Sequence, residues 1–391
     1  ISMRRLYISI ALACGLLALS CATTSTQIVD EVSEPLRAGI LKHAREDMTA
    51  EPVTVTSFIA ERSAGSAHDF YSEGDYWWPD SLNPDGPYVR RDGCTNPENF
   101  VQHRHAMIRF SQIVGNLTSA YLLTGDEKYV KPVLEHVKAW FITDSTRMNP
   151  NLLYAQAIKG IATGRGIGII DTIHLMEVAQ SMLRLREAGV LPQEVDSGAC
   201  EWFSEYLNWL MTHPYGVEEM NAKNNHGTCW AMQVAMFAKY LGNKEIMTMC
   251  ADRFKNVFIV NQMAEDGSFP QELRRTKPYG YSLFNLDAMA TICQILSTDE
   301  DNLWDYTTDN NLNMRKAIEY MYPFIEDKGT WKLDADVMYW DEWPVAHPSL
   351  LFAWNHWGDK KYFDTWAKYE HFPENEEVIR NLPVRNPVIW L

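Results

Sequence analysis

The 391-residue sequence contains few cysteines, and no two of them form a closely spaced pair. Two of the seven, Cys14 and Cys21, lie near the N-terminus, and the other five follow no C-x-x-C pattern. Structural zinc sites and disulfide-stapled domains both need regularly spaced cysteines. The sequence therefore indicates neither a zinc site nor a disulfide framework, and we expect no bound metal.

Basic residues are also scarce. The chain has 35 Lys and Arg against 51 Asp and Glu, which gives a formal net charge of −16. Proteins that bind nucleic acid need clustered Lys and Arg to neutralise phosphates, so we exclude a nucleic-acid partner. The same deficit argues against a polyanionic substrate, although a cleft can be basic inside an acidic molecule.

One apolar run stands out, near the N-terminus. Arg4 and Arg5 precede an apolar stretch over residues 6–19, which is too short to span a membrane and is typical of a signal peptide. We expect a signal peptide over residues 1–21. Two interpretations stay open for Cys21: it carries a lipid anchor that ties the protein to a membrane, or it marks simple cleavage. Both export the protein to the periplasm or outer membrane of a Gram-negative bacterium.

Alternating apolar and polar residues, the pattern of a half-buried strand, are almost absent. Apolar residues instead recur at spacings of three and four, as at Met107, Phe110 and Val114, which indicates an amphipathic helix. We therefore predict an all-α fold, an (α/α) toroid of helix hairpins in a single catalytic domain over residues 22–391. Further helices are expected over 128–141, 173–188, 201–211, 228–241, 282–296 and 313–322, the last stopped by Pro323.

The first stretch that could carry chemistry is Asn224-Asn225-His226-Gly227, just before an expected helix. One interpretation is a helix cap, because Asn side chains accept hydrogen bonds from free backbone N–H groups. The other places Asn225 and His226 in a cleft, where histidine suits proton transfer near neutral pH. No second ligand follows at helical spacing, so a metal site is not indicated.

The second stretch runs from Asp266 to Thr276 and contains Glu272 and Arg275; Tyr281 follows in a helix start. One interpretation pairs Glu272 with a neighbouring arginine on the surface, where the pair would contribute little stability. The other brings Arg275 and Tyr281 together beside a sugar carboxylate. A tyrosine hydroxyl has a pKa of about 10, so it needs a nearby cation to act as a base.

Together the two stretches resemble the alginate-lyase superfamily, most closely polysaccharide lyase family 38 and more distantly family 5. The resemblance rests on Asn-Asn-His-Gly, then Asp-Gly-Ser-x-Pro-x-Glu-Leu-x-Arg-Thr and Tyr-Ser-x-Phe-Asn-Leu, and it covers residues 71–343. It implies a toroid fold and cleavage of O4-linked uronic acids by elimination, without metal or cofactor. It also implies that Asn225, His226, Arg275 and Tyr281 are the catalytic residues.

An aromatic and basic loop resembles the superfamily's N-terminal cleft loop. It holds Trp77, Trp78, Arg90 and Arg91, which we expect to contact substrate, and it could close over the cleft as a lid. A purely structural role for this Trp- and Pro-rich loop is the alternative.

Six further residues are candidate substrate contacts. Tyr154, Gln156 and Arg165 lie in a segment that also looks like family sequence; its Gly-x-Gly follows no predicted strand, so we exclude nucleotide binding. The others are Asn224, Glu272 and Tyr279. Tyr279 is also an alternative to Tyr281 as the catalytic tyrosine, because the spacing from arginine to tyrosine is one residue shorter than in family 5.

The sequence as a whole predicts a polysaccharide lyase that acts on an anionic polysaccharide. Alginate is the leading substrate, and glucuronan is an alternative with the same chemistry. Two other classes stay open: a glycoside hydrolase on the same scaffold, which needs two facing carboxylates, and a non-catalytic glycan-binding lipoprotein. Elimination leaves an unsaturated sugar end and hydrolysis does not, so the products distinguish these classes.

Overall fold

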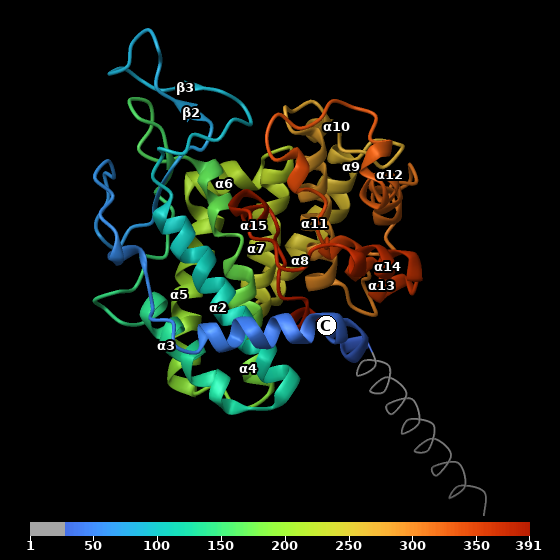
Figure 1. Cartoon of the computed structure of the whole chain (residues 1–391), viewed down its shortest axis with the longest axis horizontal. Coiled ribbons are helices and arrows are strands. Elements are labelled where there is room, and N and C mark those ends of the chain that lie inside the picture. The colour runs from blue at the N-terminus through green and yellow to red at the C-terminus, as the bar shows by residue number, and fades with distance from the viewer. Residues whose placement is uncertain (1–27) are drawn as a thin grey trace, which may run out of the picture.

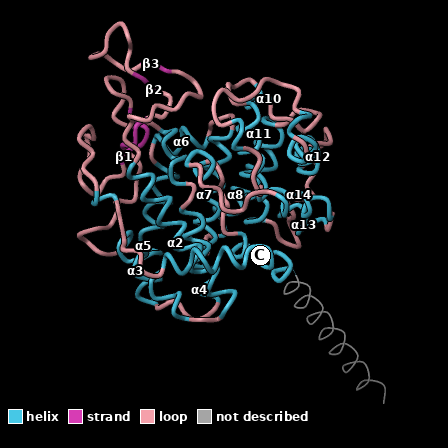
Figure 2. The backbone as a smooth tube through the Cα atoms, in the orientation of Figure 1, coloured by secondary structure: helices cyan, strands magenta, loops and turns pink. Residues whose placement is uncertain are grey.

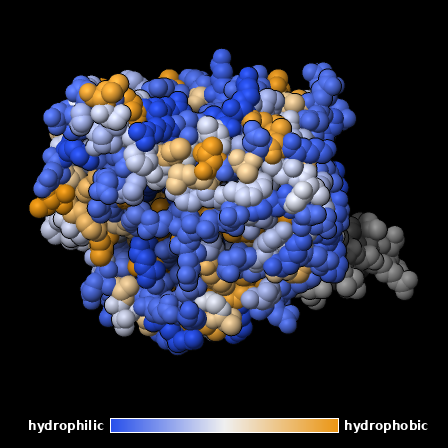
Figure 3. Space-filling model, turned by 45° about the horizontal axis from the view of Figure 1, so that its top comes forward, coloured by the Kyte–Doolittle hydropathy of each residue, from blue (hydrophilic) through white to orange (hydrophobic). Residues whose placement is uncertain are grey.

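The computed structural model describes residues 28–391, and helices make up most of this part of the chain (Figure 1, Figure 2). Within these residues, no helix is long and apolar enough to cross a bilayer. The predicted signal peptide and Cys21 lie outside the described residues, so export and lipidation stay predictions. The face turned toward the viewer in Figure 3 is mainly hydrophilic, with apolar residues scattered across it.

Five successive helix pairs build the body of the molecule. The first helix of each pair packs against the first helix of the next, so these five form a continuous inner layer. Their partners pack outside them, which gives the predicted (α/α) toroid. The inner helices are α2 (Gln102–Thr124), α4 (Leu175–Glu187), α7 (Asn225–Leu241), α11 (Pro278–Leu296) and α13 (Pro348–Trp357). The outer helices are α3 (Val130–Phe141), α5 (Gln193–Thr212), α8 (Lys244–Arg253), α12 (Met314–Glu326) and α14 (Lys360–Lys368).

Helices α7 and α11 form the centre of the core, and nearly every side chain in both is buried. Their sequences are apolar on all sides, which is typical of helices surrounded by protein. Helix α12 departs from the prediction, because it continues through Pro323 to Glu326. Pro323 lies near the C-terminal end of that helix, so its missing N–H removes only one hydrogen bond from the last turns.

Both ends of the described chain pack against α2. A helix over residues 28–47 lies beside the C-terminus (Figure 1), and its Asp47 accepts a hydrogen bond of 2.8 Å from Asn116 of α2. The C-terminal segment runs to a short 3-10 helix, Pro387–Trp390, that packs on α2 and α4. Buried Glu177 of α4 anchors this segment by accepting hydrogen bonds from it.

Short strands and helices cover the other end of the toroid. Strand β1 (Tyr71–Glu73) pairs in parallel with β4 (Tyr154–Ala157), and β2 (Trp77–Trp78) pairs antiparallel with β3 (Val89–Arg90). The β2–β3 hairpin projects above the helices in Figure 1. The remaining short helices are α6 (Pro214–Met220), α9 (Ile259–Gln262), α10 (Pro270–Leu273) and α15 (Glu376–Arg380).

Candidate active site

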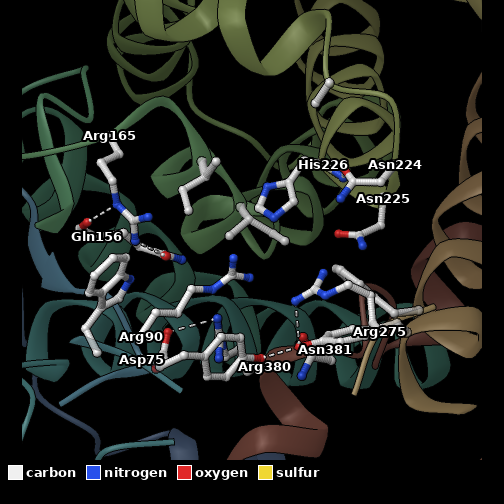
Figure 4. Close-up of a pocket in the computed structure, with 17 residues that line it drawn as sticks. Asp75, Arg90, Gln156, Arg165, Asn224, Asn225, His226, Arg275, Arg380 and Asn381 are labelled. Carbon is white, nitrogen blue, oxygen red and sulfur yellow. Dashed lines mark hydrogen bonds and ion pairs between the residues drawn. The ribbon is translucent and has the colours of Figure 1, made fainter. Parts of the chain in front are cut away.

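A cavity of about 320 Å³ opens where the N-terminal ends of α7 and α11 meet the hairpin and α15 (Figure 4). The first N–H groups of both helices are already bound by side chains, those of Asn225 and His226 by Glu272 and Asn224, and those of Tyr279 and Gly280 by Asp336. The polar and charged residues that line the cavity are Asp75, Tyr76, Trp77, Arg90, Gln156, Arg165, Asn224, Asn225, His226, Arg275, Tyr281, Arg380 and Asn381.

Asn225 is held in place by Glu272. The Asn225 backbone N–H donates to Glu272 Oε1 at 2.8 Å, and its side-chain Nδ2 donates to Oε2 at 2.7 Å. Because the Glu272 side chain is buried, desolvation raises its pKa. The orientation of the Asn225 amide is therefore fixed, and its second N–H remains available to a ligand in the cavity.

His226 occupies the first turn of α7, where the Asn224 side chain caps the helix. Asn224 Oδ1 accepts from the His226 backbone N–H at 3.2 Å, so the predicted cap exists alongside the site. The His226 Nδ1 lies 2.6 Å from Oε1 of buried Glu219, which leaves Nε2 as the ring nitrogen free for a ligand. Burial alone would lower the pKa of His226, but the charge and hydrogen bond of Glu219 hold it above its usual value.

The hydroxyl of Tyr281 meets two polar partners. It lies 2.7 Å from the Tyr76 hydroxyl, and Arg275 Nη2 donates to it at 3.3 Å. The Arg275 guanidinium also lies over the tyrosine ring, 4.3 Å from its centre. Burial is the largest influence on the pKa of Tyr281 and raises it well above the usual value, while Lys277 and Arg275 oppose this rise. The sequence-based expectation of an arginine beside this phenol is met, but the cations do not outweigh burial.

Arg275 also ties the hairpin to the helical body. Its Nε and Nη2 donate to the two carboxylate oxygens of Asp92 at 3.1 and 2.9 Å, and Thr276 Oγ1 adds a third hydrogen bond at 3.1 Å. Arg90 contacts the same carboxylate at 2.6 Å. Burial would raise the pKa of Asp92, but these partners hold it at about 2. Asp92 is therefore charged near neutral pH and fixes the plane of the Arg275 guanidinium.

The opposite end of the cavity holds a second arginine, Arg165 (Figure 4). Its Nε donates to the Gln156 backbone oxygen at 2.8 Å and its Nη2 to the Gln156 side chain at 3.3 Å. The guanidinium lies 5.7 Å from the Trp77 ring centre, and burial lowers its pKa to about 10. Gln156 has a φ of 49°, a left-handed conformation that costs free energy for a residue with a side chain.

A model of the alginate lyase family matches residues 54–331, which is most of the chain. The chain belongs to the alginate lyase family. This membership confirms the prediction of a polysaccharide lyase of that type. The finer assignment to polysaccharide lyase family 38 stays a prediction.

Solved alginate lyases share the fold. One from Bacteroides ovatus has a TM-score of 0.79 and 29% sequence identity, covering 94% of this chain and 97% of that one. One from Sphingomonas species A1 has a TM-score of 0.51 and 12% identity, covering 82% and 88%. A histidine-to-alanine variant of alginate lyase A1-III, complexed with tetrasaccharide, has a TM-score of 0.52 and 13% identity, covering 80% and 82%. No curated protein matches the chain in sequence.

In this alginate lyase family member, two of the predicted substrate contacts are buried and do not line the cavity. Tyr279 is fully buried; its hydroxyl donates to the Phe324 backbone oxygen at 2.8 Å, and its ring packs edge-on against Trp331 and Trp340. Tyr279 therefore cannot replace Tyr281 at the cavity. Glu272 is also buried and reaches Asn225 instead of the cavity.

Three further predicted contacts do not line the cavity. Trp78 donates its indole N–H to the Cys94 backbone oxygen at 2.9 Å, and Arg91 stacks over that indole, 5.0 Å from its centre. The Tyr154 ring packs against Gly65. The hairpin alternates sides along each strand, so Trp77 and Arg90 face the cavity while their neighbours face away.

Sequence reasoning missed four polar residues that line the cavity: Asp75, Tyr76, Arg380 and Asn381. Tyr76 lies inside the aromatic loop that the sequence had marked, so its chemistry could have been considered there. Arg380 is the last residue of α15 and Asn381 follows it; both lie beyond the matched family segment, and no motif surrounds them. Arg380 reaches the cavity because Asp75 binds it at 3.0 Å.

Proposed function

We propose that this protein cleaves alginate by β-elimination, with Tyr281 transferring the protons. One observation carries the proposal: a buried tyrosine hydroxyl contacts Arg275 in a cavity that Asn225 and His226 also line. These groups can bind a uronate carboxylate beside a proton donor. The chemistry needs no group other than these side chains.

The first requirement of the reaction is to acidify the C5 proton of the sugar. That proton is very weakly acidic until the neighbouring carboxylate charge is neutralised. Arg275 provides a cation, Asn225 a fixed N–H and His226 a ring nitrogen, and all three line one end of the cavity. Donors placed where negative charge develops stabilise the enolate-like intermediate, as in an oxyanion hole.

The second requirement is proton transfer at C5 and O4. In mannuronate these positions lie on the same side of the ring, so Tyr281 acts first as base and then as acid. In guluronate they lie on opposite sides, so His226 takes the C5 proton and Tyr281 protonates O4. The product carries a 4,5-unsaturated uronyl end. The raised pKa of Tyr281 keeps its hydroxyl protonated near neutral pH, which suits the acid role on guluronate, whereas the base role on mannuronate requires this hydroxyl to ionise first.

The charge of the cavity supports an anionic substrate in spite of the net charge of −16. Four arginines line it: Arg90, Arg165, Arg275 and Arg380. Among the described residues that line it, Asp75 is the only carboxylate, and two arginines bind it. This composition favours a lyase over a glycoside hydrolase, which needs two carboxylates facing the sugar.

Alginate is favoured as the substrate by the family and by the similarity to the Bacteroides ovatus alginate lyase. The test is to incubate the purified protein separately with polymannuronate, polyguluronate and glucuronan, and to follow the ultraviolet absorbance of the unsaturated product. We expect a rise on at least one alginate block. A rise on glucuronan alone would show that alginate is not the substrate. New reducing ends without a rise in absorbance would show that the protein is a hydrolase.

A further inference from the structure

A buried lysine lies behind the catalytic tyrosine. Lys277 is the residue just before α11, and its side chain is only 5% exposed. Its Nζ donates to Glu377 Oε1 of α15 at 2.7 Å, and Glu377 is 6% exposed. Ionised lysines are rarely buried unless they are paired, because desolvation is costly. Lys277 does not line the cavity, so the substrate-binding residues do not explain its position.

The ammonium of Lys277 is surrounded by tyrosine rings. Nζ lies 5.0 Å from the ring centre of Tyr281, 5.2 Å from that of Tyr76 and 5.4 Å from that of Tyr339. These distances are within the range of cation–π attraction. Tyr76 and Tyr281 are also the two residues whose hydroxyls meet at 2.7 Å. One buried cation therefore faces both members of the hydroxyl pair.

A chain of buried ion pairs holds Lys277 in this position. Glu377 also accepts from Arg380 at 3.2 Å, and Arg380 pairs with Asp75 at 3.0 Å. Asp75 precedes Tyr76 in the sequence. The ion pairs therefore run from Lys277, beside the two tyrosine rings, through Glu377 and Arg380 to the residue next to Tyr76. Both Glu377 and Arg380 lie in α15, beyond the matched family segment.

We propose that Lys277 is a positioning residue that stabilises the ionised form of Tyr281, and that Glu377 of α15 holds it there. This rests on the proposed function, because only a lyase that uses Tyr281 as a base needs the phenolate. Arg275 cannot provide this stabilisation alone, since it is bound to Asp92 and faces the substrate carboxylate. Lys277 is a second cation, and substrate does not compete for it.

The electrostatic setting agrees with this role. Burial alone would lower the pKa of Lys277, but Glu377 holds it above its usual value, so the side chain stays charged. Of the two cations that lower the pKa of Tyr281, Lys277 has the larger effect. The other titratable or charged groups around Tyr281 and Lys277 are Tyr76, Asp75, Asp92, His226, Arg275, Asp336, Tyr339, Glu377 and Arg380.

The test compares Lys277→Met with Lys277→Arg in the full-length protein, using polymannuronate across a range of pH. We expect Lys277→Met to move the rising limb of kcat/KM upward by about one pH unit or more, because a nearby cation no longer stabilises the phenolate. Below that limb kcat should fall about tenfold, while KM stays within about threefold. Lys277→Arg should keep the limb in place. An equal loss at every pH in both variants would overturn the proposal.

Two further measurements separate this role from folding and from the proposed function. The tyrosinate absorbance of Lys277→Met, with and without Tyr281→Phe, reports ionisation of Tyr281 directly and needs no activity. We expect the Tyr281 part of this titration to occur at higher pH in Lys277→Met than in the wild type. A titration at the same pH in both proteins would overturn the proposal, even if no polymer is cleaved. Lys328→Met is the matched control: the Lys328 ammonium faces the Trp340 ring at 4.6 Å, whereas the cations over the Tyr281 ring are Arg275 and Lys277, so this variant should leave both readouts unchanged.

Discussion

The two ring nitrogens of His226 have different surroundings. Nδ1 contacts buried Glu219, whereas Nε2 is the nitrogen left for substrate. Because Glu219 raises the pKa of His226, the ring binds its proton more strongly than a free histidine. A charged ring helps to neutralise a carboxylate, but a base must be neutral. The contact with Glu219 therefore favours cleavage at mannuronate, where a charged His226 neutralises the carboxylate. At low pH it slows cleavage at guluronate, where His226 must be neutral to act as the base.

The variant Glu219→Gln tests whether Glu219 sets the protonation of His226. Without the Glu219 carboxylate, burial is the largest influence left on the ring, and it lowers the pKa of His226. We expect the rising limb of kcat/KM on polyguluronate to move to lower pH, since His226 becomes neutral earlier. On polymannuronate the limb should stay in place, because Tyr281 is the base there. Measuring both pH profiles checks this, and an upward shift on polyguluronate would contradict it.

At the residue scale, the sequence placed Asn225, His226, Arg275 and Tyr281, all of which line the cavity. The sequence left Tyr279 and Tyr281 as alternatives for the catalytic tyrosine. Residues two apart on a helix point about 200° apart, so only one of them can face the cavity, and the register depends on tertiary packing. No sequence motif pointed to Lys277, because Glu377, the residue that pairs with it, is 100 residues away in the sequence.

The N-terminus of α7 sets the position of the Asn225 and His226 side chains. Asn224 caps this helix and also lines the cavity, so both interpretations of the Asn-Asn-His-Gly stretch apply at once. We expect Asn224→Ala to lower the free energy of unfolding by about 1 kcal/mol, because a free backbone N–H loses its acceptor. Asn224→Asp should keep most of the stability. Chemical denaturation measures both, and equal stability of the two variants would contradict this role.

At the element scale, apolar periodicity predicted the long helices because each buries one side or all of its surface. It did not predict how the short strands pair. Strand β1 pairs with β4 across about eighty residues of sequence, and the register is set by packing on the toroid, not by a local turn. The side of the hairpin that faces the cavity was therefore not predictable. Trp78 and Arg91 were expected at the cavity, but they lie on the other side of the hairpin.

At the scale of the whole molecule, Glu177 attaches the C-terminal segment to the inner helix α4. Glu177 Oε1 accepts from the backbone N–H groups of Arg385 and Asn386, both at 2.9 Å, and from the Trp390 indole at 3.2 Å; Oε2 accepts from Asn386 Nδ2 at 2.8 Å. The segment has no helical periodicity, so its attachment to α4 was not predictable from the sequence. Long-range hydrogen bonds, not local propensity, fix its place.

The variant Glu177→Gln tests this attachment of the C-terminal segment to α4. A glutamine presents an N–H group where the segment offers only donors, so buried donors lose their acceptor. We expect the free energy of unfolding to fall by roughly 1 to 3 kcal/mol, with kcat unchanged because Glu177 does not line the cavity. The matched control is Glu135→Gln, which breaks only an exposed ion pair with Lys131 and should have little effect. Equal stability of Glu177→Gln and Glu135→Gln would contradict a stabilising role for this attachment.

The most direct test of β-elimination through Tyr281 is to measure the unsaturated product formed by Tyr281→Phe, together with its binding of polymannuronate. Tyr279→Phe is the matched control, because it removes a tyrosine hydroxyl two residues away that points into the core. We predict that Tyr281→Phe loses about 10³-fold or more in turnover while it still binds the polymer, and that Tyr279→Phe stays active. Turnover by Tyr281→Phe at the rate of the wild type would contradict the mechanism.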